Sequence, residues 1–234
     1  MKKYVPHFFT CLNLICGCLA ILLISKDNYY ATVIFCLFAF LFDFIDGFLA
    51  RLLNTESGIG RQLDSFSDFV TSGVVPGFVM YKLLIKSGLS EKLIISNLLN
   101  LNFYFSPISL LGFLITIATA FRLSKFNLTK NEDNYFQGLP APANCCMIIG
   151  LPFMFDFLGE KYLNHNLLFT ITIFSIYILN SKIKLISLKN INILIVLLLF
   201  CLIASLVVLT NFAILTVFIF MYMVVSLTYF QFRN

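Results

Sequence analysis

Four aspartates stand close together within residues 43–68, and they constrain this mostly apolar chain more than any other feature; they are Asp43, Asp46, Asp64 and Asp68. The first two lie three residues apart and the last two lie four apart, so each pair shares one face of a helix. The Ser-Gly-Ile-Gly sequence at 57–60 predicts a break between these two helices. Folded as an antiparallel hairpin, the two helices would bring all four carboxylates into one small volume.

Four carboxylates in a low-dielectric volume repel one another strongly, so the cluster indicates bound cations. Carboxylate oxygens are hard ligands, and they favour Mg²⁺, Mn²⁺ or Ca²⁺. The alternative is a set of buried salt bridges to Arg51 and Arg61, but two arginines cannot neutralise four aspartates. We therefore predict a cation site on this hairpin.

Composition places the hairpin in a membrane protein. The 234 residues are 60% hydrophobic and 12% charged, and several apolar runs reach the ~20 residues that a membrane helix needs. We predict an all-α integral membrane protein with about eight transmembrane helices, with six or seven as the alternatives. The runs lie near 8–25, 29–53, 64–85, 107–121, 143–158, 166–180, 191–209 and 211–230.

The seven cysteines lie in or beside these apolar runs, and no CxxC pair has a partner pair. We expect them to be small buried apolar residues rather than a disulfide framework or a zinc site.

The distribution of basic residues predicts the orientation in the membrane. With eight spans and a cytoplasmic N-terminus, eleven of the sixteen Lys and Arg residues fall on the cytoplasmic side and five on the other. Basic residues are enriched in cytoplasmic loops, so both termini are expected in the cytoplasm. The 43–68 hairpin then lies at the cytoplasmic edge of the membrane, and the cell (plasma) membrane is the expected location.

The hairpin resembles the signature of the CDP-alcohol phosphatidyltransferases, eight fixed residues at fixed spacing. That signature reads Asp-x2-Asp-Gly-x2-Ala-Arg-x8-Gly-x3-Asp-x3-Asp, and it runs here from Asp43 through Gly47, Ala50, Arg51 and Gly60 to Asp68.

Two flanking stretches resemble the bacterial and archaeal phosphatidylserine synthase branch of this family. In VPHFFTCLNLICGCLAI the matching residues are Pro6, Thr10, Asn13 and Gly17, and His7 replaces the usual Asn. In FRLSKFNLTKNEDNYFQGLPAPAN the matches run from Arg122 to Ala143, with Ser124-Lys125 where Ala-Arg is common. The resemblance covers about residues 4–145.

The resemblance implies a six-helix core at 1–180, followed by a C-terminal transmembrane hairpin at 181–234. It implies transfer of a phosphatidyl group from CDP-diacylglycerol to an alcohol, with two Mg²⁺ or Mn²⁺ ions held by Asp43, Asp46, Asp64 and Asp68. Asp68 would also be the catalytic base that takes the proton of the attacking hydroxyl. The implied CDP-diacylglycerol-binding residues are Pro6, Thr10, Asn13, Gly47, Ala50, Arg51, Ser57 and Gly60.

The acceptor that this branch implies is L-serine, whose carboxylate needs a cation. Arg122 and Lys125 are the candidates, with Asn127 as a polar neighbour. The positive-inside rule would also place basic residues here. Pro140 and Pro142 exclude a regular helix across residues 138–143, so we expect a rigid entry into the fifth span near the acceptor. A helix that starts with proline in its first positions is a compatible alternative.

Parts of the sequence are also compatible with other functions. The same chemistry could serve glycerol phosphate, inositol phosphate or choline, although the 122–143 motif argues against these acceptors. Membrane prenyltransferases also bind pyrophosphate through Asp-rich helices, but with different spacing. An ion transporter would carry acids along its path, whereas here they gather at one edge. The family resemblance also suggests a homodimer.

Overall fold

The computed structural model describes residues 4–88, 93–95, 103–105, 108–128, 135–159, 162–186 and 211–231, and most of them are helical. The larger helices are α1 (Tyr4–Ser25), α2 (Tyr29–Leu52), α3 (Gly58–Phe69), α4 (Val75–Lys86), α5 (Leu114–Leu128), α6 (Ala141–Ile149), α7 (Leu151–Leu158), α8 (His165–Asn180) and α10 (Ala213–Gln231). Two five-residue segments accompany them: the π-helical turn η1 (Val70–Val74) and the 3₁₀ turn η2 (Ser109–Phe113).

In the part of the chain that the structure describes, four three-residue strands form two antiparallel pairs. β1 (Leu93–Ile95) pairs with β2 (Phe103–Phe105), and β3 (Tyr135–Gln137) pairs with β4 (Lys184–Ile186). The second pair joins the segment before α6 to the segment after α8. β4 adds the buried Leu185 to the core, but helices make up most of the described residues, so the all-α prediction is confirmed.

Among the described residues, six helical segments are long and apolar enough to cross a membrane; they are Tyr4–Ser25, Tyr29–Leu52, Gly58–Lys86, Ser109–Leu128, Ala141–Leu158 and Ala213–Phe230. The shorter α8 is also apolar. Such helices satisfy their backbone groups internally, as lipid requires. These seven segments coincide with seven predicted runs. The eighth run, 191–209, lies outside the described residues, so the count of eight stays a prediction.

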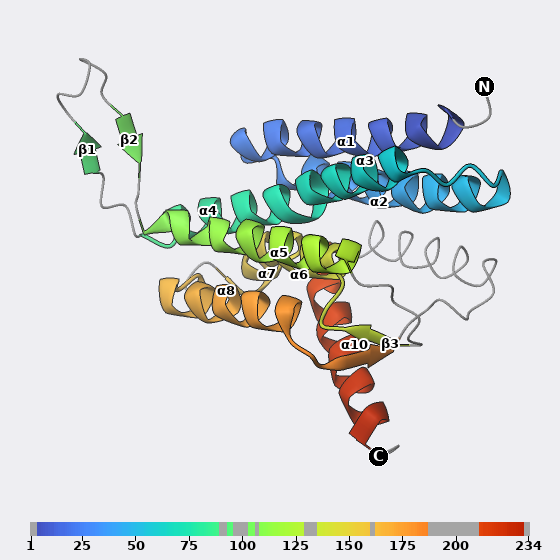
Figure 1. Ribbon diagram of the computed structural model, residues 1–234. Helices are drawn as coiled ribbons and strands as arrows, with labels where there is room; N and C mark the ends of the chain where they lie inside the picture. The colour runs from blue at the N-terminus through green and yellow to red at the C-terminus, as the bar shows by residue number, and fades with distance from the viewer. Residues whose placement is uncertain are drawn as a thin grey trace.

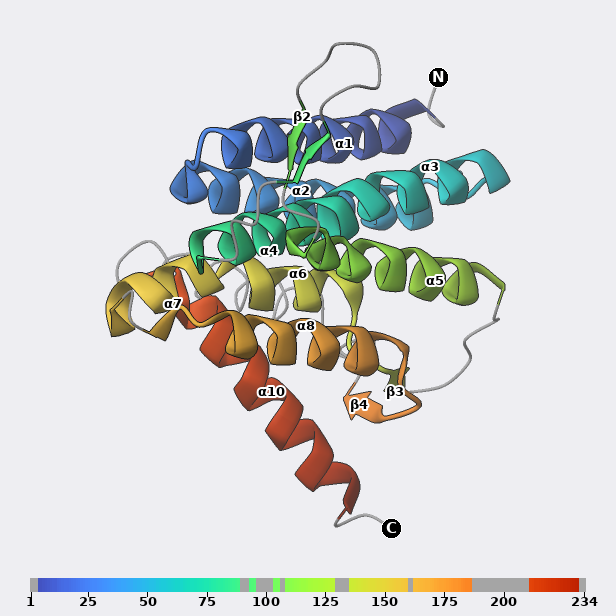
Figure 2. The same cartoon turned by 90° about the vertical axis from the view of Figure 1, so that its left-hand side faces the viewer.

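The first three spans form one side of the bundle (Figure 1). A tight turn at 26–28 joins α1 to α2, and the side chain of Asn28 caps α2 by accepting the Ala31 N–H at 3.1 Å. α3, η1 and α4 together make one long span beside α1. Turned by 90°, the bundle again shows the start of α1 and the α2–α3 connection at the same end (Figure 2). The acidic hairpin therefore lies at one edge of the bundle.

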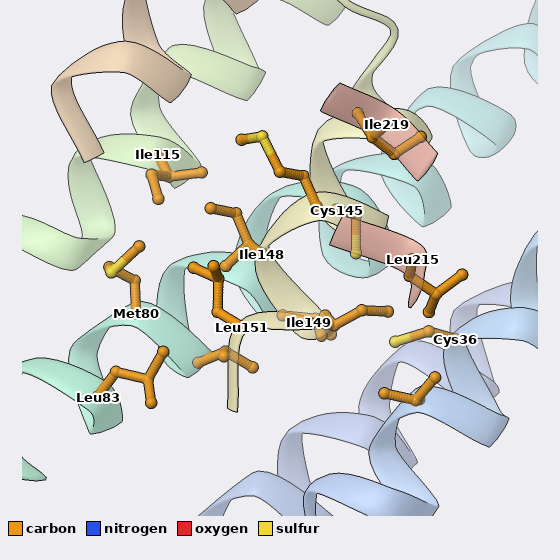
Figure 3. Packing of buried hydrophobic residues seen from close by; sticks show 14 of the residues in the cluster. Cys36, Met80, Leu83, Ile115, Cys145, Ile148, Ile149, Leu151, Leu215 and Ile219 are labelled. Atoms are coloured by element: carbon orange, nitrogen blue, oxygen red, sulfur yellow. The ribbon is translucent and has the colours of Figure 1, made fainter. Parts of the chain in front are cut away.

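The apolar core is centred on α6 (Figure 3). Cys145, Ile148 and Ile149 of α6 are fully buried, or nearly so, between residues of α2, α4, α5 and α10. α10 crosses the bundle at a steep angle in both views, yet its Leu215 belongs to the same core. The boundary predicted at 180/181 stays a prediction, and α10 packs on α6 and α7.

Close packing explains one glycine on that interface. A Cβ at Gly150 would overlap the Thr216 side chain and lie 3.0 Å from the Phe212 carbonyl oxygen. Thr216 in turn donates a hydrogen bond to the Met147 carbonyl at 2.8 Å. The last described helix is thus fixed on α6 by a polar contact as well as by apolar packing.

The cysteine prediction is partly wrong. Cys16, Cys36 and Cys145 are buried, but Cys11 and Cys18 are exposed on α1. Their face of α1 points away from the bundle, where an apolar residue suits lipid as well as it suits a core. Cys201 lies outside the described residues.

Candidate active site

The connection between α2 and α3 reverses the chain at the edge of the bundle. α2 ends at Leu52, and Asn54 adopts a left-handed conformation with φ 50°. Ser57 then caps α3, because its side chain accepts the Gly60 N–H at 3.0 Å. The predicted break at 57–60 is therefore the start of α3. Both helices pack along α1, and this arrangement turns their acidic faces toward one another.

Three aspartates converge where those faces meet. Asp43, Asp64 and Asp68 each offer one carboxylate oxygen, and the three oxygens lie within 4.8 Å of one another. Metal–oxygen distances of about 2.1 Å would let one ion contact oxygens at nearly this spacing. One oxygen of Asp64 is buried and has no hydrogen-bond partner. A buried carboxylate oxygen without a donor is well suited to a cation, so the donor set fits a divalent metal.

The fourth predicted ligand, Asp46, lies beside this cluster rather than within the group of three. Its side chain is 5% exposed, and its Oδ2 atom is also buried without a hydrogen-bond partner. Asp46 and Asp64 both line a cavity of about 280 Å³. Asp46 thus shares the lining of the cavity with Asp64, a member of the three-aspartate cluster.

The cavity contains most of the residues that the sequence predicted for the nucleotide-linked lipid. Seven of the eight line it: Pro6, Thr10, Gly47, Ala50, Arg51, Ser57 and Gly60. A Cβ built on Gly47 meets no heavy atom within 4 Å, so this side of α2 is open. The eighth residue, Asn13, does not line the cavity; its amide donates to Ser67 at 2.9 Å and to Asp68 at 3.4 Å.

Four further residues line the cavity and were not predicted as ligand contacts: His7, Thr55, Glu56 and Arg61. The ring of His7 lies against Gly60, since a Cβ at Gly60 would come within 2.8 Å of the ring carbon Cε1. In the sequence, His7 lies three residues before Thr10, and this spacing on one helix could have predicted that both side chains line the cavity. Arg61 adds a second guanidinium beside Arg51, which suits a phosphate-bearing ligand.

Two of the three residues predicted for the serine carboxylate, Arg122 and Asn127, are bonded to backbone carbonyls and to α3, respectively. Arg122 donates through Nη1 to the Gln137 carbonyl at 3.1 Å and the Leu179 carbonyl at 2.5 Å, and through Nη2 to Gly138 at 3.3 Å. Asn127 donates to Ser65, the neighbour of Asp64, at 2.9 Å. Lys125 is exposed. Of the three, Asn127 is thus joined to the helix that carries the acidic cluster.

Residues 138–143 form the expected entry into the fifth span. Gly138 has φ 69°, and its N–H donates to the Ile183 carbonyl at 2.8 Å. A Cβ there would lie 2.8 Å from the carbonyl oxygens of Ile178 and Leu179, so only glycine fits this approach. α6 then begins at Ala141, with Pro142 in its first turn.

Comparison with known proteins agrees with these features. The CDP-alcohol phosphatidyltransferase family profile matches residues 3–232. The CDP-diacylglycerol–serine O-phosphatidyltransferase of Bacillus subtilis is 36% identical over 150 residues, which is 63% of this chain and 75% of the relative.

Two archaeal proteins match over a similar region. The enzyme of the same name from Methanocaldococcus jannaschii is 32% identical over 62% of this chain and 59% of its own length. The archaetidylserine synthase of Methanothermobacter thermautotrophicus is 32% identical over 59% of this chain and 53% of its own length. The matched region thus spans between half and three quarters of these relatives. The family match, which covers nearly every residue, shows that this chain belongs to the CDP-alcohol phosphatidyltransferase family.

Proposed function

We propose that this protein transfers the phosphatidyl group of CDP-diacylglycerol to the hydroxyl of L-serine, releasing CMP in phospholipid biosynthesis. The observation that carries the proposal is the three-aspartate cluster of Asp43, Asp64 and Asp68, with Asp46 and the 280 Å³ cavity beside it. The names of the relatives support serine as the acceptor. The match of residues 122–143 to the serine branch supports it independently.

In the proposed reaction the cavity holds the cytidine diphosphate part of the donor. Arg51 and Arg61 offer planar, charged donors to its phosphates, and Gly47 leaves room for it beside the backbone of α2. Two Mg²⁺ or Mn²⁺ ions held by Asp43, Asp46, Asp64 and Asp68 would supply charge neutralisation at the pyrophosphate and the leaving CMP. The acids and the cavity lie at one end of the bundle, so the head group binds there while the acyl chains stay in lipid.

Asp68 takes the proton of the serine hydroxyl as its oxygen attacks the phosphorus atom of the phosphatidyl group. A new phosphorus–oxygen bond forms to serine, and the bond to the CMP oxygen breaks. The electron pair of that bond leaves with CMP, which departs as an anion. Positioning the two oxygens in line is the main contribution expected of the protein.

The serine carboxylate is proposed to bind near Arg122, Lys125 and Asn127. The three carbonyl contacts of Arg122 fix its guanidinium but are neutral, so they leave its positive charge uncompensated. Within the described part of the chain, no carboxylate forms an ion pair with Arg122. A guanidinium that is held in place and keeps its positive charge suits a small anionic acceptor.

The site is proposed to face the cytoplasm from the plasma membrane, where nucleotide-linked lipid and serine meet. The eleven-to-five distribution of basic residues under the eight-span arrangement supports this orientation. A homodimer is proposed from the family resemblance.

The decisive experiment measures CMP release from CDP-diacylglycerol by the purified protein, with and without serine. We expect serine-dependent release that EDTA abolishes and Mg²⁺ or Mn²⁺ restores. Asp68→Asn should lower kcat by about 10²–10⁴-fold, the usual size of a lost acid–base group. Glycerol phosphate, inositol phosphate and choline serve as competing acceptors. Release that one of these stimulates and serine does not would reassign the acceptor, and full release without any acceptor would contradict direct attack by serine.

A further inference from the structure

We propose that Asn13 is a positioning residue that fixes the carboxylate of Asp68, and this inference rests on the function proposed above. Asn13 lies on α1, fully buried, and its Nδ2 atom donates to Ser67 Oγ at 2.9 Å and to Asp68 Oδ1 at 3.4 Å. It does not line the cavity that the donor substrate would fill. Asn13 therefore acts on the reaction through its contact with Asp68 and not through contact with the substrate.

The orientation of the Asn13 amide indicates what it holds. Its Oδ1 atom is buried and has no hydrogen-bond partner among the described residues. Turning the amide over would let Oδ1 accept from the Ser67 hydroxyl, but it would then set an oxygen against the Asp68 carboxylate. Leaving the Oδ1 acceptor unsatisfied is unfavourable in a membrane span, so the contact that this orientation favours is that of the Nδ2 donor with the Asp68 carboxylate oxygen.

Packing fixes the depth at which Asn13 meets α3. One turn later on α1, Gly17 lies against Thr71, and a Cβ there would come 2.6 Å from the Thr71 Cγ2 atom. Asn13 with Ser67 and Gly17 with Thr71 are thus successive contacts, four residues apart on both helices. The close approach at Gly17 keeps the amide within reach of Asp68.

Polar residues between membrane helices also act simply as links that join the helices. In that case the contact with Ser67 would carry the effect, because it is the shorter of the two. The positioning role instead requires that the effect pass through Asp68. The two roles can be separated by changing each partner in turn.

The test compares Asn13→Ala, Ser67→Ala and Asp68→Asn, alone and combined, in the full-length protein in nanodiscs. Mn²⁺ binding is measured by electron paramagnetic resonance, and kcat and KM by CMP release. Loss of a residue that orients a metal ligand typically weakens metal binding or activity by about 10–100-fold. We expect Asn13→Ala to weaken Mn²⁺ binding or to lower kcat by this factor, with an unchanged KM for CDP-diacylglycerol. In Ser67→Ala, Mn²⁺ binding and kcat should stay within about threefold of their values in the unchanged protein.

The double variant makes the outcome decisive. If Asn13 acts through Asp68, then adding Asn13→Ala to Asp68→Asn should weaken Mn²⁺ binding no further. Additive effects, an equal loss in Ser67→Ala, or a raised donor KM with normal kcat would each overturn the inference. Thermal unfolding checks that each variant folds. Mn²⁺ binding needs no substrate, so a failure of serine-dependent CMP release would count against the proposed function alone.

Discussion

At the scale of single residues, the site depends on small side chains as much as on charged ones. Gly47 lies between the acids and Arg51 on α2, and the space beside it is open to the cavity. Gly60 lines the same cavity but is covered by the ring of His7. The two glycines therefore serve different purposes: one leaves room for a ligand, and the other admits a neighbouring side chain.

Gly47→Leu should fill the space proposed for the nucleotide. We expect the KM for CDP-diacylglycerol to rise by about tenfold, or ~1.4 kcal/mol of binding free energy, while the melting temperature barely changes. The measurement is steady-state CMP release together with thermal unfolding. Gly58→Leu is the matched control, because a Cβ at Gly58 also meets nothing within 4 Å but the residue lies outside the cavity lining. Equal effects of the two substitutions would contradict the proposed placement of the donor.

Arg122→Ala should raise the KM for serine by about tenfold or more, since a charged hydrogen bond contributes ~1.5–3 kcal/mol. It should also lower stability, because three carbonyl groups lose their donor. Serine kinetics at saturating CDP-diacylglycerol separate the two effects. Lys125→Ala tests the second basic residue, and an unchanged serine KM and kcat in both variants would remove the acceptor proposal.

At the scale of elements, the third span departs from α-helical geometry directly after Asp68. In the π-helical turn the Val75 N–H bonds to the Val70 carbonyl, five residues earlier. Side chains of other helices bond carbonyls within this turn: Thr116 Oγ1 donates to Gly73 at 2.9 Å, and Cys145 Sγ donates to Thr71 at 3.3 Å. π turns are rare and are frequently found at functional sites. The turn is thus anchored from α5 and α6.

Thr116→Val keeps the side-chain shape but removes the donor to Gly73. The expected loss is about 1 kcal/mol of unfolding free energy, or roughly 2–4 °C in melting temperature for a chain of this size. Thr119→Val is the control, because the hydroxyl of Thr119 donates to the Ile115 carbonyl of its own helix at 2.9 Å and not to η1. Thermal unfolding in the same detergent measures both. An equal or greater loss in Thr119→Val would contradict the anchoring role of Thr116.

The all-α fold and the convergence of Asp43, Asp64 and Asp68 could be predicted from the sequence, for a physical reason. Apolar runs of membrane length and the spacing of the aspartates are local patterns, so they could be predicted without knowing how the helices pack. The contacts of Asn13 with Asp68 and of Arg122 with Leu179 join residues more than fifty positions apart. Such contacts depend on the rotation of each helix about its axis, which no local pattern determines. Likewise, no local pattern in Val70–Val74 predicts the π turn.

At the scale of the whole molecule, the two ends of the bundle differ in chemistry. One end holds the aspartates, the cavity and the α2–α3 connection. The other end holds an ion pair between Lys82 and Asp27 at 3.0 Å, next to the α1–α2 turn. Spans one and three run in the same direction, which the successive contacts of α1 with α3 and η1 require. The membrane orientation therefore decides which compartment supplies the acceptor.

Cysteine substitution tests that orientation. In intact cells, a membrane-impermeant maleimide should label Asn28→Cys but leave Glu56→Cys unlabelled, and inverted vesicles should give the opposite result. The reason is the excess of basic residues predicted on the cytoplasmic side. Protein with its native cysteines provides the background, since Cys11 and Cys18 are exposed on α1. Labelling of Glu56→Cys in intact cells would place the cavity outside the cytoplasm.

The π turn also affects how this chain should be aligned with other sequences. A helix that closes its hydrogen bonds five residues back instead of four accommodates one additional residue in that turn. A relative that keeps the third span fully α-helical would therefore lack one position just after its last aspartate. A single-residue gap between Asp68 and Val75 in an alignment would then reflect a change of helical geometry, with the residues on either side still equivalent in space.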